Sequence, residues 1–202
     1  MKKIKILTSL LLTFVIAFSL TGCGEVKKAE TAVTGMFNAF KELNFEEAQK
    51  YVNVDDITSS EDESTANAEV IMKSVFKNLN YEIISSEKVD SSNVVVKTKI
   101  TATDMKPVMG NFFSKAFEYA LSNAFSDPQP TEEETNAKME EILAECASQP
   151  DLATVTNDVD IKVVKNENKE WKIEVDDAFV NAILGGLSDA VDELNKSFDN
   201  AE

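Results

Sequence analysis

Residues 81–103, YEIISSEKVDSSNVVVKTKITAT, decide the fold. From position 94 to 102 the even-numbered residues are Val, Val, Thr, Ile and Ala, whereas Lys97, Lys99 and Thr101 lie between them. This period of two predicts a strand with one buried face and one wetter face. Asp90 to Asn93 has the composition of a tight turn. We therefore expect residues 81–89 and 94–103 to form a β-hairpin.

A second hairpin is expected near the other end of the chain. Apolar residues of one parity run from Val155 to Val163, and Trp171, Ile173 and Val175 alternate with polar residues after the turn residues 166–168. The two hairpins together predict one antiparallel sheet.

Helical spacing fills the rest of the chain. Capping residues mark several starts: Asn44 with Glu47, Asp104 with Pro107 following, and Thr131 with Glu134. The predicted helices run from Val26 to about 44, over 45–52, up to Leu79, from 104 to 126, from 131 to Pro150, and from about 177 onward as one last helix. Gly185-Gly186 lies inside that last helix, and we attribute it to close packing or a helix break. The fold class is α+β, with helices packed on one face of the sheet.

This order of elements resembles the cone of the nuclear transport factor 2-like and cystatin-like superfamily. Three segments carry the resemblance: residues 40–48, the hairpin residues 169–173, and the closing helix with Phe179, Ile183 and Leu184. More narrowly, the chain is similar to bacterial lipoproteins with a domain of unknown function on that cone. The two helices over about 105–147 exceed a minimal cone, so they form a lid or belong to a different α+β layer.

The resemblance implies an apolar pocket inside the cone. Its candidate lining residues are Tyr81, Phe112, Phe117 and Trp171. Phe112, Phe113, Phe117 and Phe125 have three interpretations: core packing, which is the default, the lining of that pocket, or a partner-binding face.

The N-terminus has the pattern of a secretory leader. Lys2, Lys3 and Lys5 precede an uncharged run from Ile6 to Leu20, which at 15 residues is short of the ~20 that span a bilayer. Leu20-Thr21-Gly22-Cys23 resembles the lipobox of bacterial lipoproteins. The resemblance implies an acyl anchor, such as palmitate, on Cys23. Residues 1–22 are then a signal peptide, 23–25 a lipidated terminus with a short tether, and 26–202 a single domain on the extracytoplasmic face of the cell membrane.

Composition excludes several kinds of function. The chain has 202 residues, no histidine and a charge of −16, and lysine supplies all 20 cations. Without histidine, a Ser-His-Asp triad and a histidine-ligated metal site are impossible. The acidic balance argues against nucleic acid as a partner. Cys146 continues a stripe of Met139, Ile142 and Leu143, so we interpret it as a small buried hydrophobe.

We expect no cofactor and no built metal site. The acidic loop 55–63 lacks the glycine and the spacing of an EF-hand, so it is a solvated loop or, as the alternative, a loose divalent-cation site. Glu132, Glu133 and Glu134 suit the first turn of a helix. Asp158 and Asp160 share a strand face with Lys162, which favours solvent exposure.

Three functional hypotheses follow. The first is a non-catalytic module that binds a small apolar ligand or an envelope protein. The second is a lyase- or isomerase-type enzyme that uses one pocket carboxyl or phenol, for which Asp104, Tyr81 and Tyr119 are the candidates. The third is a transport-associated binding lipoprotein.

Overall fold

The computed structural model describes residues 23–53, 57 and 66–199, so the leader and most of the acidic loop 55–63 lie outside the described residues. It is an α+β structure, as predicted. The elements in chain order are α1 (Cys23–Lys41), α2 (Phe45–Ala48), α3 (Ala66–Phe76), β1 (Asn80–Lys88), β2 (Asn93–Thr103), α4 (Met105–Asn123), α5 (Glu132–Ala147), β3 (Thr154–Lys165), β4 (Trp171–Ile173), α6 (Asp177–Ile183) and α7 (Leu187–Asp199).

The four strands form one antiparallel sheet in the order β1-β2-β3-β4. Both predicted hairpins are confirmed. The first turn is held by Asp90, whose carboxylate accepts hydrogen bonds from the Ser92 amide and the Asn93 side chain, both at 2.7 Å. These bonds supplement the backbone bonds from the Val89 and Asp90 amides to the Asn93 carbonyl, at 3.0 and 3.1 Å, and the turn sets Lys88 opposite Val94.

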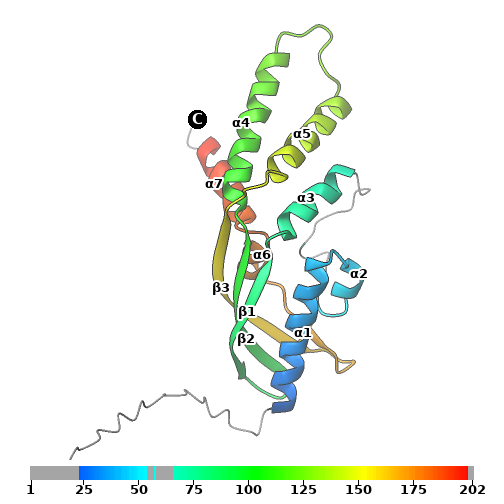
Figure 1. The fold of residues 1–202 in the computed structure, drawn as a ribbon, viewed down its shortest axis with the longest axis vertical. Helices are drawn as coiled ribbons and strands as arrows, with labels where there is room; N and C mark the ends of the chain where they lie inside the picture. Colours follow the sequence, from blue (N-terminus) through cyan, green and yellow to red (C-terminus); the bar gives the residue numbers. More distant parts are fainter. Residues whose placement is uncertain (1–22, 54–56, 58–65, 200–202) are drawn as a thin grey trace, which may run out of the picture.

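The helices cover one face of the sheet. Val94, Val96, Thr98, Ile100 and Ala102 of β2 are buried on that face, which is the face that the period of two predicted. α1 packs against all four strands, and α3 and α6 contact β2 beside it (Figure 1). The largest fully buried side chains lie in this layer and include Phe37, Phe40 and Phe179.

The opposite face of the sheet places residues of opposite charge on neighbouring strands. In the register of β2 and β3, Lys97 lies opposite Asp160 and Lys99 opposite Asp158, and the side chains of Asp158 and Asp160 are exposed. Nζ of Lys99 also lies 3.3 Å from a carboxylate oxygen of Glu82 on β1. The expected exposure of Asp158 and Asp160 is confirmed.

α4 and α5 form a helical hairpin that lies, in the sequence, between β2 and β3, the two central strands of the sheet. Figure 1 shows it projecting beyond the end of the sheet. The predicted caps are present: Asp104 accepts from the Lys106 amide at 3.1 Å, and Thr131 and Glu134 form a capping box. At its base, the Asp104 amide donates to the Ala153 carbonyl at 2.8 Å, so the hairpin begins where the pairing of β2 with β3 ends.

The prediction of one closing helix is wrong, whereas the attribution of Gly185-Gly186 to close packing or a helix break is confirmed. α6 ends at Ile183 and α7 begins at Leu187, because Gly185 and Gly186 have φ values of +61° and +80°. A helix requires negative φ at every residue. A Cβ at Gly185 would also collide with the Thr103 carbonyl oxygen, so the chain approaches β2 too closely here for any other residue.

α1 begins at Cys23, so the residues expected to form a tether, 23–25, belong to the helix instead. Its first half is joined to β1: Ser86 Oγ donates to Glu30 at 2.7 Å, and Lys88 Nζ lies 3.4 Å from Glu25. Within the described ranges, no helix combines the length and the apolar character needed to cross a bilayer.

Candidate interaction surface

Two of the four predicted pocket residues lie on the sheet, at its opposite edges. Tyr81 of β1 stacks on Phe37 of α1, with ring centroids 4.5 Å apart. Trp171 of β4 is 7% exposed, and Lys165 Nζ lies 5.9 Å from its ring centroid. β2 and β3 separate these strands, so their backbones are about 14 Å apart. Each ring therefore packs in its own part of the core.

The other two lie on the helical hairpin. Phe112 is partly buried and meets Phe113 edge-on, with ring centroids 5.2 Å apart. Phe117 is 65% exposed. The structure therefore does not bring Tyr81, Phe112, Phe117 and Trp171 together.

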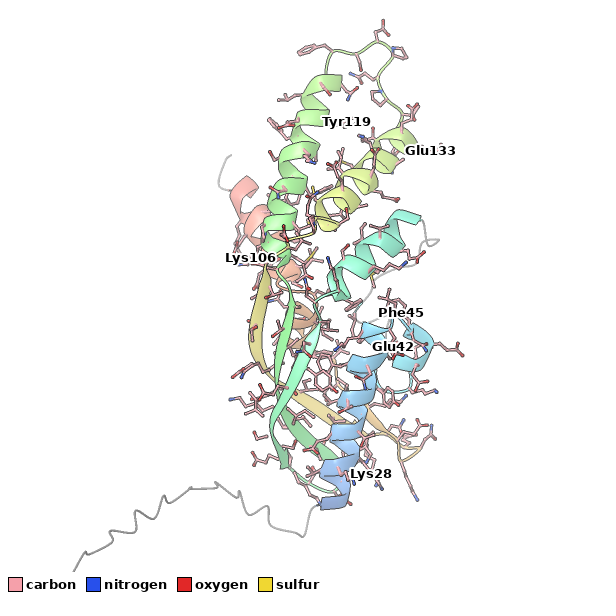
Figure 2. The ribbon with its side chains drawn as sticks, viewed as in Figure 1. Lys28, Glu42, Phe45, Lys106, Tyr119 and Glu133 are labelled. Atoms are coloured by element: carbon pink, nitrogen blue, oxygen red, sulfur yellow. The ribbon has the colours of Figure 1, made fainter. Side chains whose placement is uncertain are left out.

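The three predicted catalytic candidates also lie apart. The Asp104 carboxylate is the N-cap of α4, and the Tyr81 ring is covered by Phe37. Tyr119 is 15 residues further along α4 than Asp104, which is about 22 Å along a helix axis. Figure 2 shows this separation, with Lys106 at the base of α4 and Tyr119 towards its far end.

Open depressions on the described surface include the following two. One, of about 490 Å³, lies beside β4 and is lined by Gln49, Val52, Asn53, Lys172 and Ile173. Here Lys172 Nζ donates to the carbonyls of Gln49 and Lys50, at 3.0 and 2.7 Å, and the Ile173 amide donates to Tyr51 O at 2.8 Å. The depression is thus the joint at which the segment after α2 covers the free edge of β4.

The second depression, of about 660 Å³, lies at the start of α5. Its lining residues are Thr131, Glu132, Glu133, Asn136, Ala137 and Glu140. The Thr131 amide and hydroxyl donate to Glu134 and hold the pKa of that carboxyl below its usual range. The described residues contain no group of three or more side chains that could hold a metal ion.

Cys146 has the packing role that its spacing predicted. Its side chain is buried, at 3% exposure, and burial raises the pKa of the thiol. A thiol in such surroundings is a poor nucleophile.

Apolar residues along α4 and just after its end form the most distinctive surface. We call Phe113, Phe117, Ala120, Leu121, Ala124 and Phe125 the α4 stripe; Phe113 is half-buried and the others are exposed, and Ala124 and Phe125 follow the last residue of the helix. Positions 113, 117 and 121 are four residues apart and so share one helix face. Phe117, Leu121 and Phe125 are 65%, 58% and 98% exposed. Burying one such side chain is worth about 1.5–3 kcal/mol, so a run of them in water is costly.

The neighbours of α4 leave this face uncovered. Its more buried side chains, Met109, Phe112, Ala116 and Tyr119, follow a different face. α5 contacts α4 and is joined to it by Lys115 and Glu145, 2.6 Å apart. α7 contacts α4 near its base, where Lys106 lies 2.7 Å from Glu193. A contiguous apolar patch that the fold leaves in water typically marks an interaction site.

Core packing, the default interpretation of the four phenylalanines, is wrong for Phe117 and Phe125. A signal in the sequence could have shown this. The apolar residues of α4 occupy two helix faces, and a helix hairpin supplies only one neighbour along its length. The second face therefore needs a cover that the hairpin does not contain.

Comparisons with known proteins add a distant likeness to a solved structure. No protein-family model matches the chain, and no curated protein matches it, so the cone resemblance stays a prediction. One solved structure, a provisionally named lipoprotein (YcdA) of Bacillus subtilis, is similar at 16% identity and a TM-score of 0.42. The match covers 59% of this chain and 38% of that one.

Proposed function

We propose that this protein is a lipid-anchored extracytoplasmic binding module without catalytic activity. The observation that carries the proposal is the motif Leu20-Thr21-Gly22-Cys23 after a basic and then apolar leader. Cleavage before Cys23 would leave a diacylglyceryl thioether on the first residue of α1. Two acyl chains anchor stably where one does not. The anchor would then be joined to the folded domain without a flexible linker.

The proposed anchor and the helical hairpin lie at opposite ends of the long axis of the molecule. α1 begins at one end of the molecule and the helical hairpin projects at the other, with Lys28 near the first end and Tyr119 near the second (Figures 1 and 2). β2 starts near the anchor end, because Lys88, opposite its Val94, contacts Glu25. The lengths of β2 and of α4 as far as Phe117 place the α4 stripe roughly 50 Å from that end.

Binding is favoured over catalysis by the side chains available. An enzyme of the lyase or isomerase type needs a carboxyl or a phenol that faces bound substrate. Asp104 instead caps α4, and Tyr81 is stacked on Phe37. The α4 stripe, by contrast, is accessible and apolar, which suits an envelope protein or an apolar ligand.

The anchor is tested by expressing the full chain in a bacterial host and measuring the mass of the protein recovered from membranes. We expect a mature chain that starts at Cys23 and carries a diacylglyceryl group and fatty acid. Cys23→Ala should abolish both the added mass and the cleavage. Cys146→Ala is the matched control, because it removes the other cysteine and should leave lipidation unchanged. Recovery of wild-type protein without lipid would contradict the proposal.

A further inference from the structure

We propose that the α4 stripe binds a cationic amphipathic helix of another envelope protein. The inference rests on the proposed lipid anchor, which excludes one occupant of the stripe, and deepens that function by naming the class of partner.

The shape of the stripe matches recognition of one helix by another. Phe113, Phe117 and Leu121 recur at every fourth position, and Ala120 and Ala124 lie between their rows. Small residues beside large ones let a second helix approach closely, with its own apolar side chains between the aromatic rings. Helix faces recognised in this way are read through anchors at such spacings.

The stripe cannot be covered by the bilayer in which the Cys23 anchor would be inserted. The stripe lies at the end of the molecule opposite α1's first residue, about 50 Å away by the element lengths. A domain joined to its anchor without a linker cannot fold back over that distance. The stripe therefore faces the space beyond the membrane surface, where another protein can reach it.

The charge around the stripe selects a cationic partner. Residues 105–150 hold eight carboxylates and three lysines, a balance of −5. All three lysines are paired with carboxylates: Lys106 with Glu193, Lys115 with Glu145, and Lys138 with Glu141. Glu118 lies within the length of the stripe and Asp127 two residues beyond it, and both are exposed. Exposed carboxylates beside an apolar face attract a partner that is apolar on one face and basic on the other.

The same charge disfavours a second copy of this chain. After removal of residues 1–22 the balance is 17 lysines against 36 carboxylates, or −19. A symmetric dimer through the stripe would bring two hairpins of −5 together, and like charges across an interface are repulsive.

The test uses the lipidated protein in zwitterionic nanodiscs and two labelled peptides of about 18 residues, a length that spans the stripe. Both peptides place leucine at helical spacing; one carries lysine and the other glutamate on the opposite face. Fluorescence anisotropy gives the Kd, with empty nanodiscs as the blank. We expect the leucine–lysine peptide to bind at least about tenfold more tightly than the leucine–glutamate peptide, and to weaken as NaCl rises from about 0.05 to 0.5 M.

Phe117→Ser combined with Leu121→Ser should weaken the leucine–lysine peptide by at least about tenfold, because central apolar contacts dominate such interfaces. Val89→Ser is the matched control, because Val89 is also an exposed apolar residue, at 62%, but follows β1 near the anchor end. The Kd of the leucine–lysine peptide for this variant should stay within about twofold of the wild-type value. If the double variant fails to fold, Phe125→Ser alone, at a side chain 98% exposed, should give a smaller loss in the same direction.

Three results would overturn the inference: no binding of the leucine–lysine peptide, equal binding to the double variant, or a dimer in sedimentation that the double variant abolishes. The anchor is read separately, from the mass of the same preparation. An unlipidated Cys23 with stripe-dependent peptide binding contradicts the anchor alone, and a lipidated chain without binding contradicts the partner alone.

Discussion

The amide of Met105 donates a hydrogen bond of 2.9 Å to the carbonyl of Gly185. Met105 is the first residue of α4, and its N–H has no acceptor inside the helix. Gly185 lies in the break between α6 and α7. The bond therefore joins the base of the projecting hairpin to the segment between the two closing helices. Gly185 also approaches Thr103, the last residue of β2, at this point. The bond makes the glycine pair part of the support for the α4 stripe.

Gly185→Ala should destabilise the protein. A residue with a side chain at φ +61° costs about 1–3 kcal/mol, and the added Cβ would meet the Thr103 carbonyl. Urea unfolding, followed by the fluorescence of Trp171, the single tryptophan, measures the change.

Gly110→Ala is the matched control for that substitution. A Cβ at Gly110 meets nothing within 4 Å, and the position lies inside α4. We expect no loss of stability, or a gain of about 0.5–1 kcal/mol, because alanine restricts the unfolded chain and favours the helix. Equal effects of the two substitutions would contradict the role given to Gly185.

The link between α4 and α5 should depend on pH. A hydrogen bond from Lys115 lowers the pKa of Glu145 from its ordinary value of 4.5. Because the pKa is lower in the folded state, the pair stabilises the fold above the unfolded pKa, and that contribution is lost as the pH falls through the folded pKa. Carboxyl resonances of Glu145 followed by NMR should titrate below pH 4.5.

Lys115→Met should return the Glu145 titration to its ordinary range. Lys73→Met is the matched control, because it removes a lysine that pairs with Glu69 on α3. It should leave the pKa of Glu145 at its wild-type value. A Glu145 pKa that is the same with and without Lys115 would show that the ion pair is absent in solution.

Thr131→Ala should weaken the start of α5 by about 1 kcal/mol, because it removes the acceptor of the Glu134 amide. Hydrogen exchange of the α5 amides measures the effect locally. Thr135→Ala, one turn into the same helix, removes a hydroxyl that only donates back to the Thr131 carbonyl at 2.9 Å. It should leave exchange unchanged or slow it, since alanine is the better helix former.

Cys146 should react with thiol reagents far more slowly in the native protein than in urea. Burial both shields the thiol and raises its pKa, so reaction requires local opening. In a chain with Cys23→Ala we expect a difference of about 100-fold or more. Ser122→Cys, introduced together with Cys146→Ala, places the only thiol on the exposed surface of α4 and should react at the rate of a free thiol. Fast native modification of Cys146 would contradict its buried position.

Local patterns were sufficient to predict most elements. The alternation in residues 94–102 predicted the buried face of β2, and Asp90 predicted its turn, because both depend on interactions within a few residues. Asp104 and Thr131 predicted helix starts for the same reason, since a capping bond joins positions two or three apart. The leader and the cysteine motif are likewise local patterns, and residues 1–22 lie outside the described structure.

Exposure was decided by tertiary contacts. Phe112 and Phe117 have the same side chain and lie in the same helix. Phe112 is nevertheless partly buried and Phe117 is 65% exposed, because α4 has neighbours on only part of its circumference. The break at Gly185 was likewise settled by how closely the chain approaches Thr103, a residue 82 positions earlier. A period in the sequence predicts which side chains share a face. Only the packing of elements that are distant in the chain determines whether that face meets another one or water.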